Sequence, residues 1–242
     1  MEAAQSKGIV LRTLGASAIR IHTPDFAYLH EKANRRISDL DFASYKKFAK
    51  ELIGHISGLG YEIDNRLYAI HGLTRQRYFA KKTGLMVDVF FDKLMMCHDV
   101  DFTGRLELDS PTITVTDLLL EKLQIVGLGG KDLVDVIMLL AGHPVEKGNE
   151  KDCINCEYIS RIMGKDWGFY YTVTTNLKKT SEALPQFSYV TEDIKTRIQS
   201  RITDLLTAIE DEPKSTGWKL RARVGPKKQW YREVDSFFAA QG

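Results

Sequence analysis

Two short, strand-like segments of the chain carry acidic residues where apolar ones are expected. The segment SDLDF places Asp39 and Asp41 on either side of Leu40, and the segment MVDVFF contains Asp88. Residues i and i+2 of an extended strand lie on the same face, so Asp39 and Asp41 should point one way and Leu40 into the core. A carboxylate within a hydrophobic strand is costly to bury without a cation or a donor beside it. The pattern predicts a site where three carboxylates meet, which would suit Mg²⁺ with substrate phosphates completing its ligand shell.

Length and charge leave most function classes open. A chain of 242 residues can form one large domain or two modest ones. Its 34 basic and 32 acidic residues give a net charge of +2, which indicates no overall preference for nucleic acid or membrane. No apolar run approaches the roughly 20 residues that cross a bilayer, and the first residues lack the pattern of a signal peptide. The odd cysteine count (Cys97, Cys153 and Cys156) argues against a secreted disulfide framework and favours the cytoplasm.

Apolar periodicity, glycines and prolines predict an N-terminal domain with both helices and strands. We expect helical residues over 8–22 with a break at Gly15, a polar connection over 23–37, a strand over 38–43 and an amphipathic helix over 44–58. Hairpin strands are expected over 66–71, 76–80 and 85–91, with a turn at residues 83–84. Helices should follow over 117–125, capped by Thr114 or Thr116, and over 131–141.

A change of composition near residues 143–151 predicts a domain boundary. The pattern after it is mostly helical, with helices expected over 150–163, 166–183 and 190–211. The sequence therefore predicts an α/β or α+β domain over 1–145 and a mainly helical C-terminal domain over 146–242 with a basic and aromatic tail.

The order of these features resembles a known family. The turn Gly15-Ala16-Ser17 opens a helix, the Asp-x-Asp pair and a strand carboxylate follow, and a lysine-bearing helix comes last. This order is similar to that of the nucleotidyltransferase superfamily, which includes the polymerase-β-like enzymes. Within it, the segments DLLLEKLQI and KDLVDV resemble the AbiEii-like toxin branch and its uncharacterised relatives. The resemblance covers roughly residues 8–141; the family's second glycine is Ala16 here, and the stretch before Asp39 is several residues longer than usual.

The resemblance implies an α+β fold, with a nucleotidyltransferase-like mixed β-sheet flanked by helices, and a role for each candidate residue. The serine hydroxyl and backbone N–H groups at the helix start would bind nucleotide phosphates. The Asp-x-Asp pair would hold two divalent ions, and the third aspartate would complete the second ion site and help to activate the acceptor. The lysine would neutralise triphosphate charge. The implied residues are Gly15, Ser17 and Lys122 for nucleotide binding, Asp39, Asp41 and Asp88 for the metal, and these aspartates with Lys122 and Asp132 for catalysis.

The implied reaction moves a nucleoside monophosphate from a nucleoside triphosphate (NTP) to an acceptor, with release of pyrophosphate. The acceptor could be RNA, a protein side chain or a small molecule, and Mg²⁺ or Mn²⁺ is the implied cofactor. A toxin role would add an antitoxin as a partner. Two alternatives stay open: a non-catalytic protein that binds nucleotide or nucleic acid on the same scaffold, and a phosphotransferase that uses the same acids.

The candidate residues also have purely structural interpretations. The Asp-x-Asp pair can be solvated strand-end acids, and the glycine–serine turn can be a simple helix cap. Asp88 can lie at a sheet edge and pair with Arg75 or Arg77. Lys122 can face solvent, and Asp132 can simply complement the dipole of its helix.

Cysteine and glycine motifs give weaker signals. Cys153 and Cys156 form a single C-x-x-C, and a zinc site would need two more ligands, for which only Cys97 and His98 are candidates. Inert, partly buried cysteines are the favoured interpretation, and the histidines form no spaced pair typical of a metalloenzyme. The chain has no Walker-type loop and no G-x-G-x-x-G, which disfavours P-loop and dinucleotide-binding folds.

The C-terminal tail combines basic and aromatic residues. Residues 214–232 contain basic side chains and no acidic one, with Trp218, Trp230 and Tyr231 between them. This composition is typical of a surface that binds phosphates and stacks on unpaired bases. The alternative is a terminal strand or hairpin around residues 224–226 whose tryptophans pack on the helical domain. The candidate RNA contacts are Arg221, Arg223, Lys227, Lys228 and Trp230.

Overall fold

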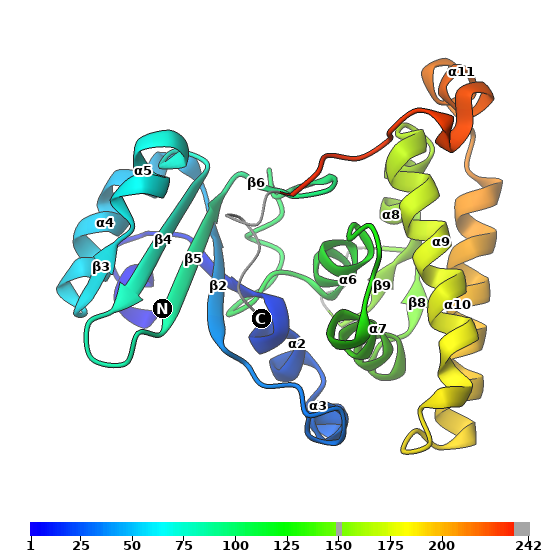
Figure 1. The fold of residues 1–242 in the computed structure, drawn as a ribbon, viewed down its shortest axis with the longest axis horizontal. Coiled ribbons are helices and arrows are strands. Elements are labelled where there is room, and N and C mark those ends of the chain that lie inside the picture. Colours follow the sequence, from blue (N-terminus) through cyan, green and yellow to red (C-terminus); the bar gives the residue numbers. More distant parts are fainter. Residues whose placement is uncertain (149–151, 235–242) are drawn as a thin grey trace.

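The protein is an α+β molecule built on a mixed β-sheet, as expected (Figure 1). The computed structural model describes residues 1–148 and 152–234. Within these residues the main sheet has the strand order β1-β2-β5-β4-β3. The pair β2–β5 is parallel, and the other neighbouring pairs are antiparallel. The strands are β1 (Leu11–Leu14), β2 (Asp39–Ser44), β3 (Tyr61–Ile63), β4 (Arg75–Ala80) and β5 (Met86–Phe91).

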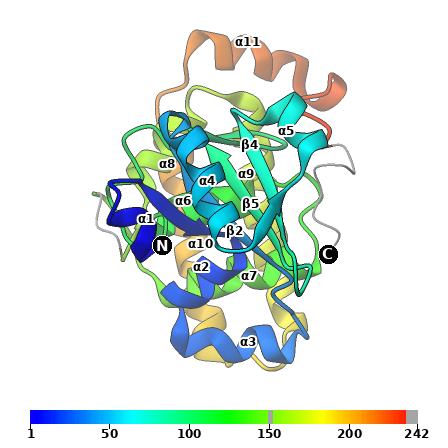
Figure 2. The same ribbon diagram turned by 90° about the vertical axis from the view of Figure 1, so that its left-hand side faces the viewer.

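The two faces of the sheet pack against different helices, because apolar residues alternate along the strands. Val87, Val89 and Phe91 of β5 belong to a core with α1 and α4, whereas Phe90 belongs to the core on the opposite face. In Figure 2, α4 and α5 lie in front of the sheet. In Figure 1, α2, α6 and α7 lie between the sheet and the C-terminal helices. The helices of this part are α1 (Glu2–Gln5), α2 (Gly15–His22), α3 (Ala27–Lys32), α4 (Ala49–Gly58), α5 (Asn65–His71), α6 (Val115–Leu123) and α7 (Gly130–Gly142).

The C-terminal helices share one hydrophobic core with α2, α6 and α7. This core includes Leu118 and Leu139 on one side of the predicted boundary at 145/146 and Leu177 and Ile202 on the other. All residues of α6 are buried, as expected for a helix surrounded by other elements. The elements after α7 are β8 (Val145–Glu146), β9 (Ile154–Asn155), α8 (Cys156–Met163), α9 (Trp167–Ala183), α10 (Glu192–Asp211) and α11 (Thr216–Val224).

Short elements connect these layers. The hairpin β6 (Lys93–Met95) and β7 (Asp99–Asp101) follows β5 directly. The 3-10 helices are η1 (Pro24–Phe26), η2 (Lys46–Phe48), η3 (Leu184–Gln186) and η4 (Gly225–Lys227). In the part of the chain that the structure describes, no helix has both the length and the apolar character needed to span a bilayer.

Most of the expected elements are confirmed, with shifted ends. The strands at 38–43, 76–80 and 85–91 are β2, β4 and β5, and the turn at 83–84 is present. The expected helices at 44–58, 117–125, 131–141, 166–183 and 190–211 are α4, α6, α7, α9 and α10, and Thr114 caps α6 by accepting a hydrogen bond from the N–H of Asp117. The helix expected over 150–163 begins at Cys156, and part of that range (149–151) lies outside the described residues.

Four expectations are wrong. Residues 11–14 form strand β1 rather than a helix, because they pair with β2. The expected connection over 23–37 contains α3. Residues 66–71 lie in helix α5, whose first turn is capped by Asp64 accepting from the N–H groups of Arg66 and Leu67. The tail forms helix α11 rather than a strand or hairpin.

Candidate functional site

The sheet brings the three predicted aspartates to one cavity. In the parallel pair β2–β5, Asp41 lies opposite Asp88, and Asp39 lies two residues before Asp41 on the same face. All three line a cavity of about 680 Å³. Leu40 packs instead against the core on the other face, as predicted. Lys122 of α6 and Asp132 of α7 line the same cavity, so five of the predicted site residues meet there.

The turn at Gly15 is built around two carboxylates. Gly15 has φ +72°, and a Cβ on it would lie 2.7 Å from Asp41 Oδ2. Its backbone N–H donates to Glu121 Oε2 at 2.9 Å. Only glycine fits this position, because both its conformation and its closeness to Asp41 exclude a side chain. The first N–H of α2, expected to bind phosphate, therefore holds the side chain of Glu121 in this structure.

The other residues of the turn differ in their access to the cavity. Ala16 lines the cavity together with Leu14. Gly15 and Ser17, predicted to bind nucleotide, are not among its lining residues. Ser17 lies in the first turn of α2 and is half-buried.

The carboxylates of the cavity crowd negative charge together. Burial raises the pKa of the Asp41 carboxyl to about 8, and the charges of Asp39, Glu121 and Asp88 act in the same direction. Burial also raises the pKa of Glu121, against the opposing effect of Lys122. A cation at this position would relieve the repulsion.

Asp88 is held by two arginines of the neighbouring strand. Its Oδ2 accepts from Arg75 Nη2 at 2.7 Å and from Arg77 Nη2 at 3.0 Å, and its Oδ1 accepts from Arg77 Nε at 3.0 Å. The structural alternative of an ion pair with Arg75 or Arg77 is thus found, with both arginines. The expectation that Asp88 lies at a sheet edge is wrong, because its strand β5 lies between β2 and β4.

The carboxylates of the cavity suit a cation that is bound partly by the protein and partly by substrate phosphates. Among the described residues, no group of three or more His, Cys, Asp and Glu side chains is placed to hold a metal ion. Neither the three aspartates nor Cys97, His98, Cys153 and Cys156 form such a group in the described part of the chain. Magnesium, however, is commonly held by one or two carboxylates together with substrate phosphates and water. Asp39 and Asp41 supply such a pair, whereas Asp88 already binds two guanidinium groups.

Lys122 lies at the centre of a buried charge network. Its Nζ is 3.3 Å from Glu121 Oε1, 3.2 Å from Asp132 Oδ1 and 3.2 Å from Asp135 Oδ2. Burial opposes its charge, but Glu121, Asp135 and Asp132 outweigh burial and raise the pKa of Lys122, so it is protonated. The alternative of a solvent-facing Lys122 is wrong, since its side chain is 8% exposed.

Four residues of this network, His30, Arg35, Glu121 and Asp135, were not among the site residues predicted from the sequence. Asp135 Oδ1 lies 2.7 Å from His30 Nε2, and its Oδ2 lies 3.1 Å from Arg35 Nη2. Burial opposes the charge of Asp135, but Lys122, His30 and Arg35 outweigh it and hold its pKa well below the usual range. Arg35 and Glu121 also line the cavity. The available signals were the Arg-Arg pair before Asp39, the Glu-Lys pair in an apolar helix and two aspartates one turn apart in α7.

The tail residues fall into packed and exposed groups. Arg221 donates to the carbonyl groups of Gly225 and Lys228, and its guanidinium lies 4.6 Å from the ring of Trp167. Trp230 Nε1 donates to Thr172 Oγ1 at 3.0 Å. The tryptophans thus pack on the helical part, as the alternative interpretation expected. The exposed candidates for phosphate contacts are Arg223, Lys227 and Lys228.

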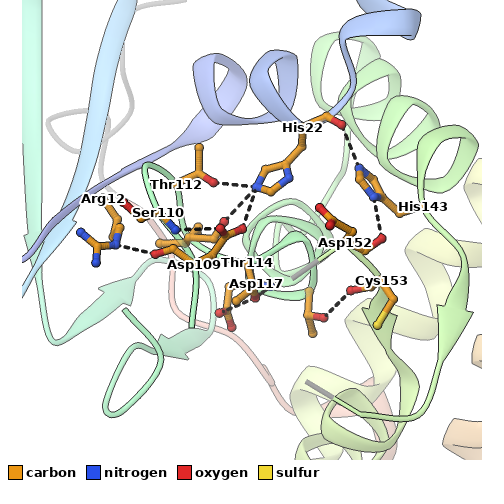
Figure 3. A network of polar contacts seen from close by, with 12 residues as sticks. Arg12, His22, Asp109, Ser110, Thr112, Thr114, Asp117, His143, Asp152 and Cys153 are labelled. Carbon is orange, nitrogen blue, oxygen red and sulfur yellow. Dashed lines mark hydrogen bonds and ion pairs between the residues drawn. The ribbon is translucent and has the colours of Figure 1, made fainter. Parts of the chain in front are cut away.

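A second polar network lies at the end of α2 (Figure 3), and its residues are not among those that line the cavity. His22 Nε2 is 2.6 Å from Thr112 Oγ1 and 3.4 Å from Asp109 Oδ2. His143 Nε2 lies 3.1 Å from the carbonyl oxygen of His22, and its Nδ1 lies 2.9 Å from that of Asp152. Burial lowers the pKa of His22, which favours the neutral ring. The network ties α2 to the segments before α6 and after α7, and we assign it a structural role.

No protein-family model matches the chain, and a search of curated proteins finds no significant match.

Proposed function

We propose that the protein is a metal-dependent nucleotidyltransferase that transfers a nucleoside monophosphate from an NTP to an acceptor. The observation that carries this proposal is the pair Asp39 and Asp41 on one strand face, beside the Gly15 turn, in a cavity that Lys122 also lines. Its volume of about 680 Å³ lies within the range of small-molecule sites. The raised pKa of Asp41 supports a cation between the carboxylates and the substrate phosphates.

The side chains of the cavity can divide the work of the reaction. Asp39 and Asp41 would hold Mg²⁺, which when bound supplies charge stabilisation to the phosphates. Lys122, fixed by three carboxylates, places a positive charge in the cavity wall, and Arg75, fixed by Asp88, adds a second one. The acceptor oxygen forms a bond to the α-phosphorus as the bond from that phosphorus to the bridging oxygen breaks. Pyrophosphate leaves with the bond's electron pair, and the acceptor proton passes to solvent.

The second candidate function is nucleotide binding without transfer. Two observations favour it: Glu121 occupies the first N–H of α2, and Asp88 is already paired with two arginines. In this case the cavity would bind NTP with Mg²⁺ but would not move the α-phosphate. For either function, RNA is a proposed acceptor or ligand, and the exposed Arg223, Lys227 and Lys228 are its proposed contacts.

One labelling experiment separates the candidates. The protein is incubated with Mg²⁺ or Mn²⁺, total RNA and each NTP labelled at either the α- or the γ-phosphate. The Asp39→Ala/Asp41→Ala variant is compared with Asp25→Ala, which changes an exposed aspartate outside the cavity. Transfer of α-label that is lost only in the double variant supports the enzyme. Binding without transfer supports the second candidate, transfer of γ-label alone indicates a phosphotransferase, and absence of NTP binding contradicts both proposals.

A further inference from the structure

The cavity has an apolar part as well as a charged one. The aspartates, Glu121 and Lys122 provide the charged lining. Much of the apolar lining comes from the end of β5, the β6 hairpin and the segment after α6. These segments contribute Phe90, Leu94, Met96, Ile125 and Val126. An NTP has the same division, because its triphosphate is charged and its base is planar and largely apolar on both faces.

The chain returns to this cavity after α11. In Figure 1 the red segment runs from α11 back to the β6 hairpin. We call residues 230–234 the C-terminal strap. Tyr231, Arg232, Glu233 and Val234 of the strap line the same cavity as the aspartates.

Arg232 fixes the strap to the β6–β7 hairpin. Its backbone N–H donates to the carbonyl oxygen of Cys97 at 3.0 Å, and its Nε donates to that of Met96 at 3.1 Å. Its guanidinium also forms an ion pair with Asp99. These contacts span more than 130 residues of sequence, since Arg232 and Met96 are separated by 136 positions.

A row of aromatic rings leads from α9 to the cavity. The rings of Trp167 and Tyr171 are stacked with centroids 5.1 Å apart, and the ring of Trp230 meets Tyr171 edge-on at 5.0 Å. The ring of Tyr231 meets Trp230 edge-on at 5.2 Å. Such pairs stabilise one another beyond their buried area. The last ring of the row, Tyr231, is therefore held at the cavity by its neighbours.

A glycine in α9 makes room for the strap. A Cβ on Gly168 would lie 2.5 Å from the carbonyl oxygen of Trp230. A side chain at this position would require the backbone of the strap to move. The position of the strap is thus determined from both sides, by Gly168 on α9 and by Arg232 on the hairpin.

We propose that the C-terminal strap forms the wall of the cavity that receives the nucleobase, with Tyr231 as the stacking surface. This inference rests on the proposed function and extends it, because it assigns the base-binding part of the site to residues outside the predicted family segment. Stacking on an aromatic ring accepts any base, since every base has a π-face. Tyr231 should therefore contribute to affinity for all NTPs and not for the triphosphate group.

The test compares NTPs with a ligand that lacks the base. Binding of each NTP and of inorganic tripolyphosphate, all with Mg²⁺, is measured by calorimetry for the wild type, Tyr231→Ala and Gly168→Ala. Gly54→Ala is the matched control, because a Cβ on this helical glycine of α4 meets no atom within 4 Å. We expect Tyr231→Ala and Gly168→Ala to bind NTPs about tenfold more weakly and to bind tripolyphosphate within about twofold of the wild type. The control should match the wild type for every ligand.

Other results would overturn the inference in distinguishable ways. If the wild type binds NTPs and Tyr231→Ala binds them equally well, the strap is not the base-binding wall, although the proposed function stands. If Tyr231→Ala and Gly168→Ala weaken the binding of NTPs and of tripolyphosphate equally, the substitutions act on the triphosphate and not on the base. Tighter NTP binding by Tyr231→Ala and Gly168→Ala would mean that the strap blocks the cavity instead of binding the base. If the wild type binds no NTP at all, the proposed function and this inference fall together; circular dichroism and thermal melts confirm that each variant is folded.

Discussion

At the scale of single residues, one glycine connects the two acidic elements of the cavity. Gly15 donates its N–H to Glu121 of α6, and its missing side chain leaves room for Asp41 of β2. The two carboxylates therefore approach each other across one turn of backbone, which adds to the burial that raises the pKa of Asp41 to about 8. This closeness favours the protonated form of Asp41 near neutral pH, whereas the cation that we propose for Asp39 and Asp41 would favour its charged form.

Replacing Gly15 should separate steric clash from backbone strain. Gly15→Ala adds a methyl group 2.7 Å from Asp41 Oδ2 at φ +72°. Gly104→Ala imposes a similar strain at φ +68°, but its Cβ meets nothing within 4 Å. We expect both variants to lose about 1–2 kcal/mol of unfolding free energy, because alanine is strained in the left-handed backbone conformation. Gly15→Ala should lose at least about 1 kcal/mol more because of the clash with Asp41. It should also lose Mg²⁺-dependent NTP binding. Urea unfolding measures the first effect and calorimetry the second; equal behaviour of the two variants would contradict the role given to Gly15.

At the scale of elements, strands β4 and β5 are joined by a charge cluster across the sheet. Arg77 lies opposite Asp88 in the antiparallel register, and Arg75 reaches the same carboxylate from two residues away. The side chains of these three residues are at most 10% exposed. Removal of one member of a buried ion cluster leaves the others with an uncompensated charge, which is more damaging than the loss of an exposed ion pair.

Two aspartate variants should therefore behave differently although both change the cavity. Asp88→Asn should lose about 3 kcal/mol or more of unfolding free energy, because two guanidinium groups lose their shared carboxylate. Asp39→Asn should change stability by less than about 1 kcal/mol, since Asp39 is half-buried at the start of β2. It should nevertheless lose NTP transfer. Chemical denaturation and the labelling assay measure both properties. A stable Asp88→Asn variant would show that the arginines do not depend on Asp88.

The elements also show what the sequence could predict. The alternation in residues 38–42 correctly predicts that Asp39 and Asp41 share a face, because side-chain direction in a strand is a local property. Helix α5 was missed because its apolar residues resemble a strand and only the cap at Asp64 marks it as a helix. His30, Arg35 and Asp135 were not predicted as a cluster, since α3, the segment after it and α7 meet only in the folded molecule. The strap was beyond prediction for the same reason: Arg232 and Met96 are 136 positions apart.

At the scale of the whole molecule, the hairpin beside the cavity is attached to the helical part through His98. Its ring stacks on Phe169 of α9 with centroids 4.9 Å apart, and its Nε2 lies 2.8 Å from Thr172 Oγ1. Trp230 of the strap donates to the same hydroxyl group. Hairpin, strap and α9 thus meet at Thr172, and the wall of the cavity depends on this junction.

The junction should make the stability of the protein sensitive to acid. Burial lowers the pKa of His98 to about 4, against the opposing effect of Asp166, while an unfolded histidine has a pKa near 6.5. Between these values the unfolded chain binds a proton that the folded protein does not, so this contribution to stability is lost as the pH falls from about 6.5 to about 4.

A variant without the titrating ring isolates this effect. His98→Gln keeps a polar group near Thr172 but does not titrate. The difference in unfolding free energy between wild type and variant should therefore shrink as the pH falls from about 7.5 to about 4.5. We expect a change of about 1–2 kcal/mol, after allowance for partial screening by solvent. The raised pKa of Asp41 has the opposite effect, because it stabilises the folded protein as the pH falls below about 8. This contribution is common to both proteins and cancels in the difference. Urea unfolding at each pH gives the measurement, and a pH-independent difference would mean that His98 is not held neutral at the junction.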